Sequence, residues 1–210
     1  MTRKMHLDGM VLGPVSTNCY FVQNTETGEL LIIDPADYPD QIISKVMKCQ
    51  GKPVAILLTH GHFDHIMAVN EIREKYQIPV YCEKHEEEML KDPMKNVSGA
   101  WYKPYSTHAD HLLSDNEELE LAGFRIRVLH TPGHTPGCCC YEFPEEHVLF
   151  SGDTLFFRSY GRVDFPGGSA RQMQDSVQRL LKELPEETEV YPGHDCATDI
   201  ASEKRYNPLA

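Results

Sequence analysis

The chain of 210 residues is long enough to bury the core of one domain and too short for two large ones. Hydrophobic residues make up 40% and charged residues 25% of it, which is the composition of a folded globular protein and excludes a largely disordered chain. The net charge of −12 repels phosphate backbones, and no apolar run approaches the roughly 20 residues of a membrane span, so we expect neither a nucleic-acid nor a membrane partner. We predict a single domain over residues 1–210.

The first part of the chain predicts strands followed by a helix. Short β-rich runs at 10–12, 19–23 and 30–33 are separated by turn signals and predict a β-meander. A helical pattern opens at Pro39 and ends near Gly51. The continuous apolar run 54–58 is typical of a strand that is buried on both faces.

The middle of the chain alternates helix and strand. Helices are predicted at 65–76 and 83–91, with a short strand at 79–82 between them, and this alternation indicates a layered α/β domain. From 92 to 113 the periodicity is lost, and Trp101, Tyr102 and Tyr105 are concentrated there among glycine and proline. Long irregular segments are often functional, so this one is either a lid or pocket wall, or a loop that its aromatic residues pin to the core.

The second half of the chain, like the first, predicts strands and a helix. Strands are predicted at 119–121, 124–129, 139–143, 147–151 and 189–191. The last long helix begins at Ser169, with Gln172 three residues later as in a capping box. Each half supplies a sheet and helices, which suggests two sheets packed face to face with helices outside.

The cysteines and the N-terminus favour the cytoplasm. Seven cysteines is an odd number, and three are consecutive at 138–140, which suits reduced thiols better than a disulfide framework. No CxxC spacing is present, so we interpret them as small core residues rather than metal ligands. The sequence after Met1 is mixed rather than the apolar core of a secretory signal.

The strongest functional signal is Thr59-His60-Gly61-His62-Phe63-Asp64-His65, placed between the buried strand and the next helix. Layered α/β sheets place their ligands at such strand ends. Three imidazoles and one carboxylate on a tight turn can face one small volume, and these donors suit Zn, Fe or Mn. The motif therefore predicts a metal site.

Three further candidates follow separate strands, each next to a glycine. His134 lies in Thr131-Pro-Gly-His-Thr-Pro-Gly137, Asp153 in Ser151-Gly-Asp-Thr154 and His194 in Tyr191-Pro-Gly-His194. Glycine permits the tight turns that aim a ligand into a cavity. Each residue alone is more typical of a turn, but their repetition predicts that all three join the site.

HxHxDH followed by PGHTPG, SGDT and PGH, in that order, resembles the metallo-β-lactamase superfamily. Its glyoxalase II-like hydrolases are the most similar group, because the segments 154–156, 161–168 and 203–209 also resemble their signatures. The resemblance implies an α/β fold, a four-layer αββα sandwich with two divalent metal ions between its sheets, zinc being favoured over Fe or Mn. It also implies the ligands: His60, His62 and His134 on one metal, Asp64, His65 and His194 on the other, and Asp153 bridging them.

The implied mechanism needs no side-chain nucleophile. Two divalent cations lower the pKa of a bridging water enough to give hydroxide near neutral pH, and this hydroxide attacks the substrate carbonyl. Asp64 is expected to orient the hydroxide as well as to bind metal. Asp34 matches the family's first-motif aspartate, so we expect it to hold a ligand loop in place rather than bind metal itself.

The substrate is predicted only by class. The resemblance implies a small-molecule thioester, S-lactoylglutathione or another acyl thiol, although residues 1–210 do not include the helical domain that supplies glutathione-binding residues in hydroxyacylglutathione hydrolases. Tyr160 and Arg162 are candidate substrate-binding residues: Arg162 can bind a carboxylate in bidentate fashion, or form a structural salt bridge with Asp164. The oligomeric state is not predicted.

The alternative function is a persulfide dioxygenase with one iron, because that related family shares the GRxD element and an ending that resembles Pro192-Gly-His-Asp195. Hydrolysis of another ester, a lactone, a phosphodiester or a β-lactam, or a non-catalytic metal-binding role, are weaker alternatives. The remaining histidines are not expected to bind the metals: His108 and His111 follow no buried strand, and His130 is expected to support the site by a hydrogen bond.

Overall fold

In the computed structural model the described residues are 4–210, so the first three residues of the predicted domain lie outside them. The first sheet within this range is six-stranded, in the order β1-β2-β3-β4-β5-β6. Its strands are β1 (Met5–Leu12), β2 (Thr17–Asn24), β3 (Glu29–Ile33), β4 (Lys52–Leu57), β5 (Val80–Glu83) and β6 (His111–Leu113). Strands β1 to β3 are antiparallel, as in the predicted meander, and β3 to β6 are parallel.

The second sheet within residues 4–210 is also six-stranded, in the order β14-β13-β10-β9-β8-β7. Its strands are β7 (Glu118–Leu121), β8 (Phe124–His130), β9 (Cys139–Phe143), β10 (Val148–Gly152), β13 (Glu189–Pro192) and β14 (Thr198–Asp199). A small hairpin, β11 (Leu155–Phe156) and β12 (Ser159–Tyr160), follows β10. Strands β10 and β13 are parallel, so both end at the same edge of the sheet.

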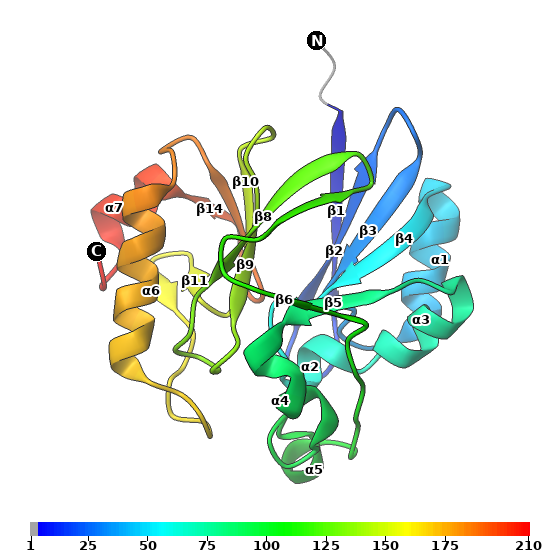
Figure 1. The fold of residues 1–210 in the computed structure, drawn as a ribbon, viewed down its shortest axis with the longest axis horizontal. Coiled ribbons are helices and arrows are strands. Elements are labelled where there is room, and N and C mark those ends of the chain that lie inside the picture. The colour runs from blue at the N-terminus through cyan, green and yellow to red at the C-terminus, as the bar shows by residue number, and fades with distance from the viewer. Residues whose placement is uncertain (1–3) are drawn as a thin grey trace.

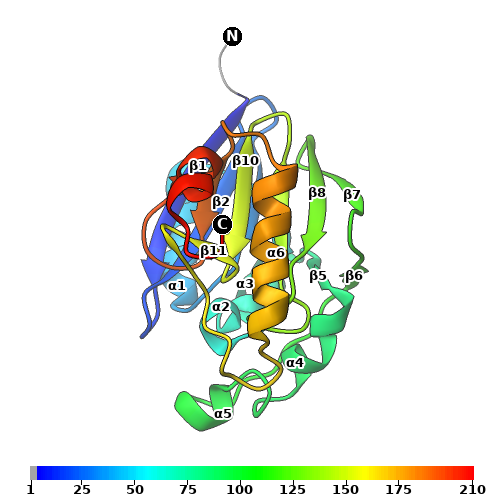
Figure 2. The ribbon, with the colours of Figure 1, turned by 90° about the vertical axis from the view of Figure 1, so that its left-hand side faces the viewer.

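The two sheets face each other and helices cover their outer faces (Figures 1 and 2). The core between the sheets includes aliphatic side chains of the first sheet and aromatic and aliphatic side chains of the second, among them Val22, Leu31, Leu57, Tyr141, Phe143 and Val128. Helices α1 (Pro39–Cys49) and α3 (Val69–Tyr76) pack on the first sheet, and α6 (Ala170–Glu183) and α7 (Ile200–Tyr206) on the second. The predicted four-layer αββα sandwich is confirmed.

Two of the predicted helices are interrupted. The helix expected at 65–76 is divided into α2 (Phe63–Ile66) and α3, because the amides of Met67 and Ala68 donate hydrogen bonds to the carbonyls of Ala36 and Pro35 instead of continuing one helix. The helix expected at 83–91 begins later, as the short η1 (Lys84–Glu86) and α4 (Glu87–Lys91). Glu83 ends β5, and its carboxylate caps η1 by accepting a hydrogen bond from the amide of His85.

The segment 92–113 is not wholly irregular, since it contains α5 (Ser98–Trp101) and ends in β6. The Tyr105 hydroxyl accepts a hydrogen bond of 2.9 Å from the amide of Asn70, which attaches the segment to α3. Trp101 is instead 61% exposed. Helix α7, capped by Asp199, was not predicted from the sequence. None of the helices in residues 4–210 is long and apolar enough to cross a membrane.

Candidate metal centre

The loops that follow β4, β8, β10 and β13 meet at one edge of the sandwich, beside α2 (Figure 1). Each loop carries candidate ligands, and the parallel pairing of β10 with β13 brings Asp153 and His194 together. Gly193 has no room for a side chain, because a Cβ atom there would clash with the Asp153 carboxylate and the His65 ring. The glycine before His194 is therefore needed for this close approach.

The structure brings all seven candidate ligands into one cluster. His60, His62 and His134 form one group, and Asp64, His65 and His194 form another. In each group the ligand atoms lie within 4.8 Å of one another. These are the two groups that the family resemblance implies.

Asp153 lies between the two groups. Its Oδ2 atom is 3.4 Å from His134 Nε2 and 3.5 Å from His194 Nε2, and its Oδ1 atom is 3.5 Å from His65 Nε2. One carboxylate thus reaches members of both groups, as a bridging ligand must.

Several buried atoms at the centre of the cluster have no hydrogen-bond partner. They are His60 Nε2, His65 Nε2 and Asp153 Oδ1. Buried polar atoms in folded proteins almost always have a partner, so three orphans in one place require an explanation. Imidazole and carboxylate donors that converge in a buried site suit a divalent metal such as Zn, Fe or Mn. The residues present therefore fit the implied metal ions.

The outer nitrogens of two ligand rings are held by hydrogen bonds. His65 donates from Nδ1 to Asp34 Oδ2 over 2.9 Å, and His134 donates from Nδ1 to the Arg162 carbonyl over 2.7 Å. Asp34 also accepts hydrogen bonds from the amide and the hydroxyl of Thr59, at 2.8 and 2.6 Å. Such partners fix the tautomer and leave Nε2 as the nitrogen that can bind a metal, and His134 Nε2 lies 2.8 Å from His62 Nδ1 within its group. Asp34 lies where a residue that supports the ligand loop is expected.

The electrostatics of the cluster favour the metal-binding forms of most ligands. Burial, with the neighbouring imidazoles, holds the pKa of His60 well below its usual range and lowers that of His62 to about 3. Burial would raise the pKa of Asp153, but the adjacent histidines lower it to about 2. Burial lowers the pKa of His65, and the surrounding carboxylates, Asp64 foremost, more than reverse this and raise it well above its usual range. A metal needs neutral imidazoles and ionised carboxylates, so His65 must lose a proton when a metal binds.

Glu86 is a residue of this site that the sequence did not reveal. It is fully buried, and its Oε1 accepts a hydrogen bond of 2.8 Å from the amide of Gly61. Its Oε2 accepts hydrogen bonds from the amide of Gly137, at 2.8 Å, and from the Thr135 hydroxyl, at 3.1 Å. One carboxylate therefore joins the loop of His60 and His62 to the loop of His134.

A cavity of about 290 Å³ opens above the ligands. Arg162 lines it, but its Nε and Nη2 atoms donate hydrogen bonds of 2.7 and 2.8 Å to the two oxygens of Asp164, which is the salt bridge considered as the alternative. Tyr160 is not among the described residues that line the cavity. It packs against the apolar cluster beneath α6.

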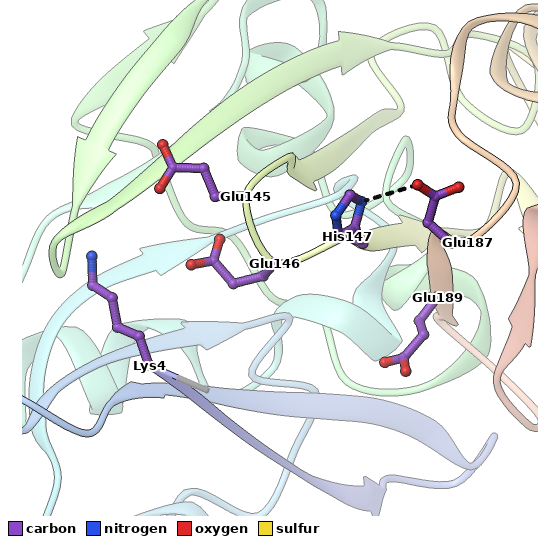
Figure 3. A pocket seen from close by; sticks show the side chains of 6 residues that line it. All are labelled: Lys4, Glu145, Glu146, His147, Glu187 and Glu189. Carbon is purple, nitrogen blue, oxygen red and sulfur yellow. Dashed lines mark ion pairs between the residues drawn. The ribbon is translucent and has the colours of Figure 1, made fainter. Parts of the chain in front are cut away.

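Two other groups of polar residues lie outside this cavity. Glu83, His85 and His130 come together, but the two imidazole rings stack nearly parallel, and His130 donates from Nε2 to the Pro136 carbonyl over 2.8 Å. This bond supports the loop of His134, in line with the expected role of His130. A second hollow, shown in Figure 3, lies at the beginnings of β1, β10 and β13, and for β10 and β13 this is the end opposite the metal ligands. It is lined by Lys4, Glu145, Glu146, His147, Glu187 and Glu189.

Comparisons with known proteins agree with this geometry. The family model of the metallo-beta-lactamase superfamily matches residues 12–194. The chain is 38% identical over 202 residues to the probable metallo-hydrolase YqgX of Bacillus subtilis (strain 168), covering 95% of each chain. It is 30% identical to the hydroxyacylglutathione hydrolase GloC of Haemophilus influenzae, covering 98% of each.

Solved structures give the same result. The crystal structure of the BLEG-1 B3 metallo-beta-lactamase is similar with a TM-score of 0.92 and 40% identity, over 97% of this chain and 99% of that one. The crystal structure of TTHA1623 in a di-iron-bound form is similar with a TM-score of 0.86 and 36% identity, over 97% and 100%. With this fold, this ligand cluster and a family model that matches most of its length, the chain belongs to the metallo-β-lactamase superfamily and is one of its metallo-hydrolases.

Proposed function

We propose that this protein hydrolyses a thioester with the help of two metal ions. The observation that carries the proposal is the pair of three-residue groups that share Asp153, because a second group has no purpose in a one-metal site. A pair of divalent ions, when bound, supplies a nucleophile from water near neutral pH and polarises the substrate carbonyl. The residues of the chain position the nucleophile and the carbonyl and set the charge around them.

Asp64 is proposed to orient the attacking oxygen. It lines the cavity, and its Oδ2 accepts a hydrogen bond of 2.8 Å from the Thr17 hydroxyl. Burial would raise the pKa of Asp64, but His65 and His194 lower it below its usual value, so the carboxylate stays ionised. An ionised carboxylate held in this way can accept a hydrogen bond from the nucleophile and fix its direction. No serine or cysteine need act covalently.

The thioester class is supported by similarity. The relative GloC is named a hydroxyacylglutathione hydrolase, and it matches this chain over nearly the whole length of both. Zinc is the metal we propose first, with Fe or Mn as alternatives, because imidazole and carboxylate ligands accept all three. The di-iron form of TTHA1623 makes iron a serious candidate.

The test is a panel of thioesters, lactones, phosphodiesters and β-lactams, assayed on protein whose metal content has been measured. We expect thioesters to be hydrolysed fastest. The variants His62→Ala and Asp153→Ala should stay soluble and lose turnover by orders of magnitude, since each removes a ligand. Full activity in either variant would refute the site.

A persulfide dioxygenase is the second candidate, and the Gly161-Arg162 element with the Arg162–Asp164 pair supports it. Oxygen uptake with glutathione persulfide separates the two functions. One iron per chain with rapid oxygen uptake would overturn the thioester proposal, whereas two metals and no oxygen uptake would support it.

A further inference from the structure

The walls of the cavity above the metal ligands are almost entirely apolar. Besides the ligands themselves, its described lining consists of Val15, Phe63, Trp101, Phe156, Arg162 and Phe165. A cavity of this kind binds apolar groups and uses a few polar groups to orient them. Here the polar groups are the ligands at its floor.

The one cationic side chain in the described lining, apart from the histidines, is already paired. Both oxygens of Asp164 accept hydrogen bonds from Arg162, in the fork geometry that a substrate carboxylate would need. The guanidinium also lies 3.8 Å from the centre of the Phe165 ring. A substrate carboxylate that used the Nε and Nη2 donors would have to displace Asp164, and the ion pair leaves no net charge on this part of the wall.

Trp101 and Phe165 both line the cavity and are in contact with each other. Trp101 comes from α5 and Phe165 from the segment between β12 and α6, and their rings meet edge to face at 5.5 Å. Phe165 in turn meets the ring of the ligand His62 at 5.4 Å. The aromatic surface is therefore continuous from a metal ligand to the outside.

Trp101 remains 61% exposed in spite of this contact. Because Trp101 lines the cavity, this exposed ring surface is available to a bound apolar group. The net charge of −12 acts in the same direction as the paired Arg162, because it disfavours the approach of anions.

We propose that the substrate is an electrically neutral thioester whose acyl group is an alkyl or aryl chain, packed against the contacting rings of Trp101 and Phe165. This inference rests on the proposed thioester hydrolysis and narrows the range of substrates. Thioesters that depend on a free carboxylate or phosphate for binding are excluded.

The fluorescence of Trp101 reports binding, because Trp101 is the single tryptophan of the chain. The metal-loaded protein is titrated with S-alkyl thioethers of N-acetylcysteamine, which lack the scissile carbonyl, and Trp101 emission is followed. The Kd should fall about fourfold for each added methylene. A thioether of equal length that ends in a carboxylate should bind about tenfold more weakly.

Three variants, each of which keeps Trp101, sharpen the test. Phe165→Ala should weaken binding of the longest alkyl thioether about tenfold, whereas Met47→Ala, which removes an exposed apolar side chain from α1, should leave its Kd unchanged. Asp164→Asn frees the guanidinium of Arg162, so it should tighten binding of the carboxylate analogue alone.

The inference is overturned if the carboxylate analogue binds the unaltered protein as tightly as the neutral one, or if the Kd does not depend on chain length. Hydrolysis of the matching acyl thioesters is measured in parallel. Apolar binding without any thioester turnover would overturn the proposed hydrolysis and leave the neutral, apolar preference of the cavity intact. Thioester turnover without a preference for apolar chains would overturn the apolar preference of the cavity and leave the proposed hydrolysis intact.

Discussion

The imidazole of His65 is held by a hydrogen bond to Asp34, which is not itself one of the candidate metal ligands. Asp34 binds both His65 and Thr59, so it joins the ligand ring to the strand end that precedes the HxHxDH motif. Loss of such a partner lets the ring turn and weakens its lone pair as a donor.

Replacing Asp34 by Asn should therefore weaken metal binding by about 10- to 100-fold. Competition with a chromogenic chelator measures the affinity. Asp8→Asn serves as the control, because Asp8 pairs with Lys45 at the surface and touches no ligand. Equal metal affinity of the Asp34 variant and the unaltered protein would show that Asp34 does not support the site.

The thiols differ sharply in exposure, which also gives a test at single residues. Cys196 is exposed, whereas Cys138, Cys139 and Cys140 are buried, and burial raises the pKa of each of these three. Since only the thiolate reacts, iodoacetamide should modify Cys196 first and the run at 138–140 only after unfolding. Peptide mass spectrometry of a time course checks this order, and early modification of the buried run would contradict the fold of β9.

The candidate ligands and the supporting residue Asp34 could be identified from the sequence, whereas Glu86 could not. His60, His62, Asp64 and His65 lie within one short motif at a strand end, so local spacing identifies them. Glu86 is one of three consecutive glutamates, and nothing local separates it from Glu87 and Glu88. Its role depends on contacts with Gly61 and Gly137, which only the tertiary fold brings to it.

At the level of elements, η1 and the loops at 58–62 and 131–137 form one unit through Glu86. The carboxylate accepts hydrogen bonds from both loops with different oxygens. An amide offers one acceptor oxygen, so in Glu86→Gln the NH₂ group must face the amide N–H of one loop or the other. One ligand loop then loses its anchor.

Glu86→Gln should lower metal affinity tenfold or more, a range typical of lost supporting contacts. Glu83→Gln is the matched control, because Glu83 is a buried glutamate of the same turn whose carboxylate binds the amide and the ring of His85 and neither ligand loop. Isothermal titration of both metal-free variants compares them. Similar losses in the two would mean that Glu86 acts through general stability alone.

Glu86 also gives the fold a pH dependence. Burial raises its pKa to about 7, above the usual value of 4.5, so between these values the folded chain holds a proton that the unfolded chain has released. Its contribution to stability is fully present below about pH 4.5 and is lost as the pH rises towards 7, by roughly 3 kcal/mol at most. The free energy of unfolding of metal-free protein should thus fall more steeply over this range than that of Glu86→Gln, and parallel curves would contradict the shift.

Element boundaries were predicted less well than element types, for physical reasons. The helix expected at 65–76 is interrupted because Met67 and Ala68 bond to Ala36 and Pro35, residues far away in sequence. Strand β6 exists because it pairs with β5, and the three residues involved carry no strand signal of their own. Tertiary hydrogen bonds decide both cases.

At the scale of the whole molecule, the ligand cluster requires both halves of the sandwich. The first sheet supplies the HxHxDH loop, and the second supplies His134, Asp153 and His194. The hydroxyl of Tyr141, in β9, donates a hydrogen bond of 2.8 Å to the Leu58 carbonyl and so ties the second sheet to the strand end before His60. The sequence predicted the sandwich because each half supplies strands and helices and because its motifs resemble those of the family, but it carried no signal for this crossing contact.

We propose that two metals act together in this cluster. Metal-free protein is titrated with zinc, and separately with iron under anaerobic conditions, while thioester hydrolysis is followed. We predict that activity is low at one equivalent per chain and reaches its maximum at two. Full activity at a single equivalent would contradict a two-metal site.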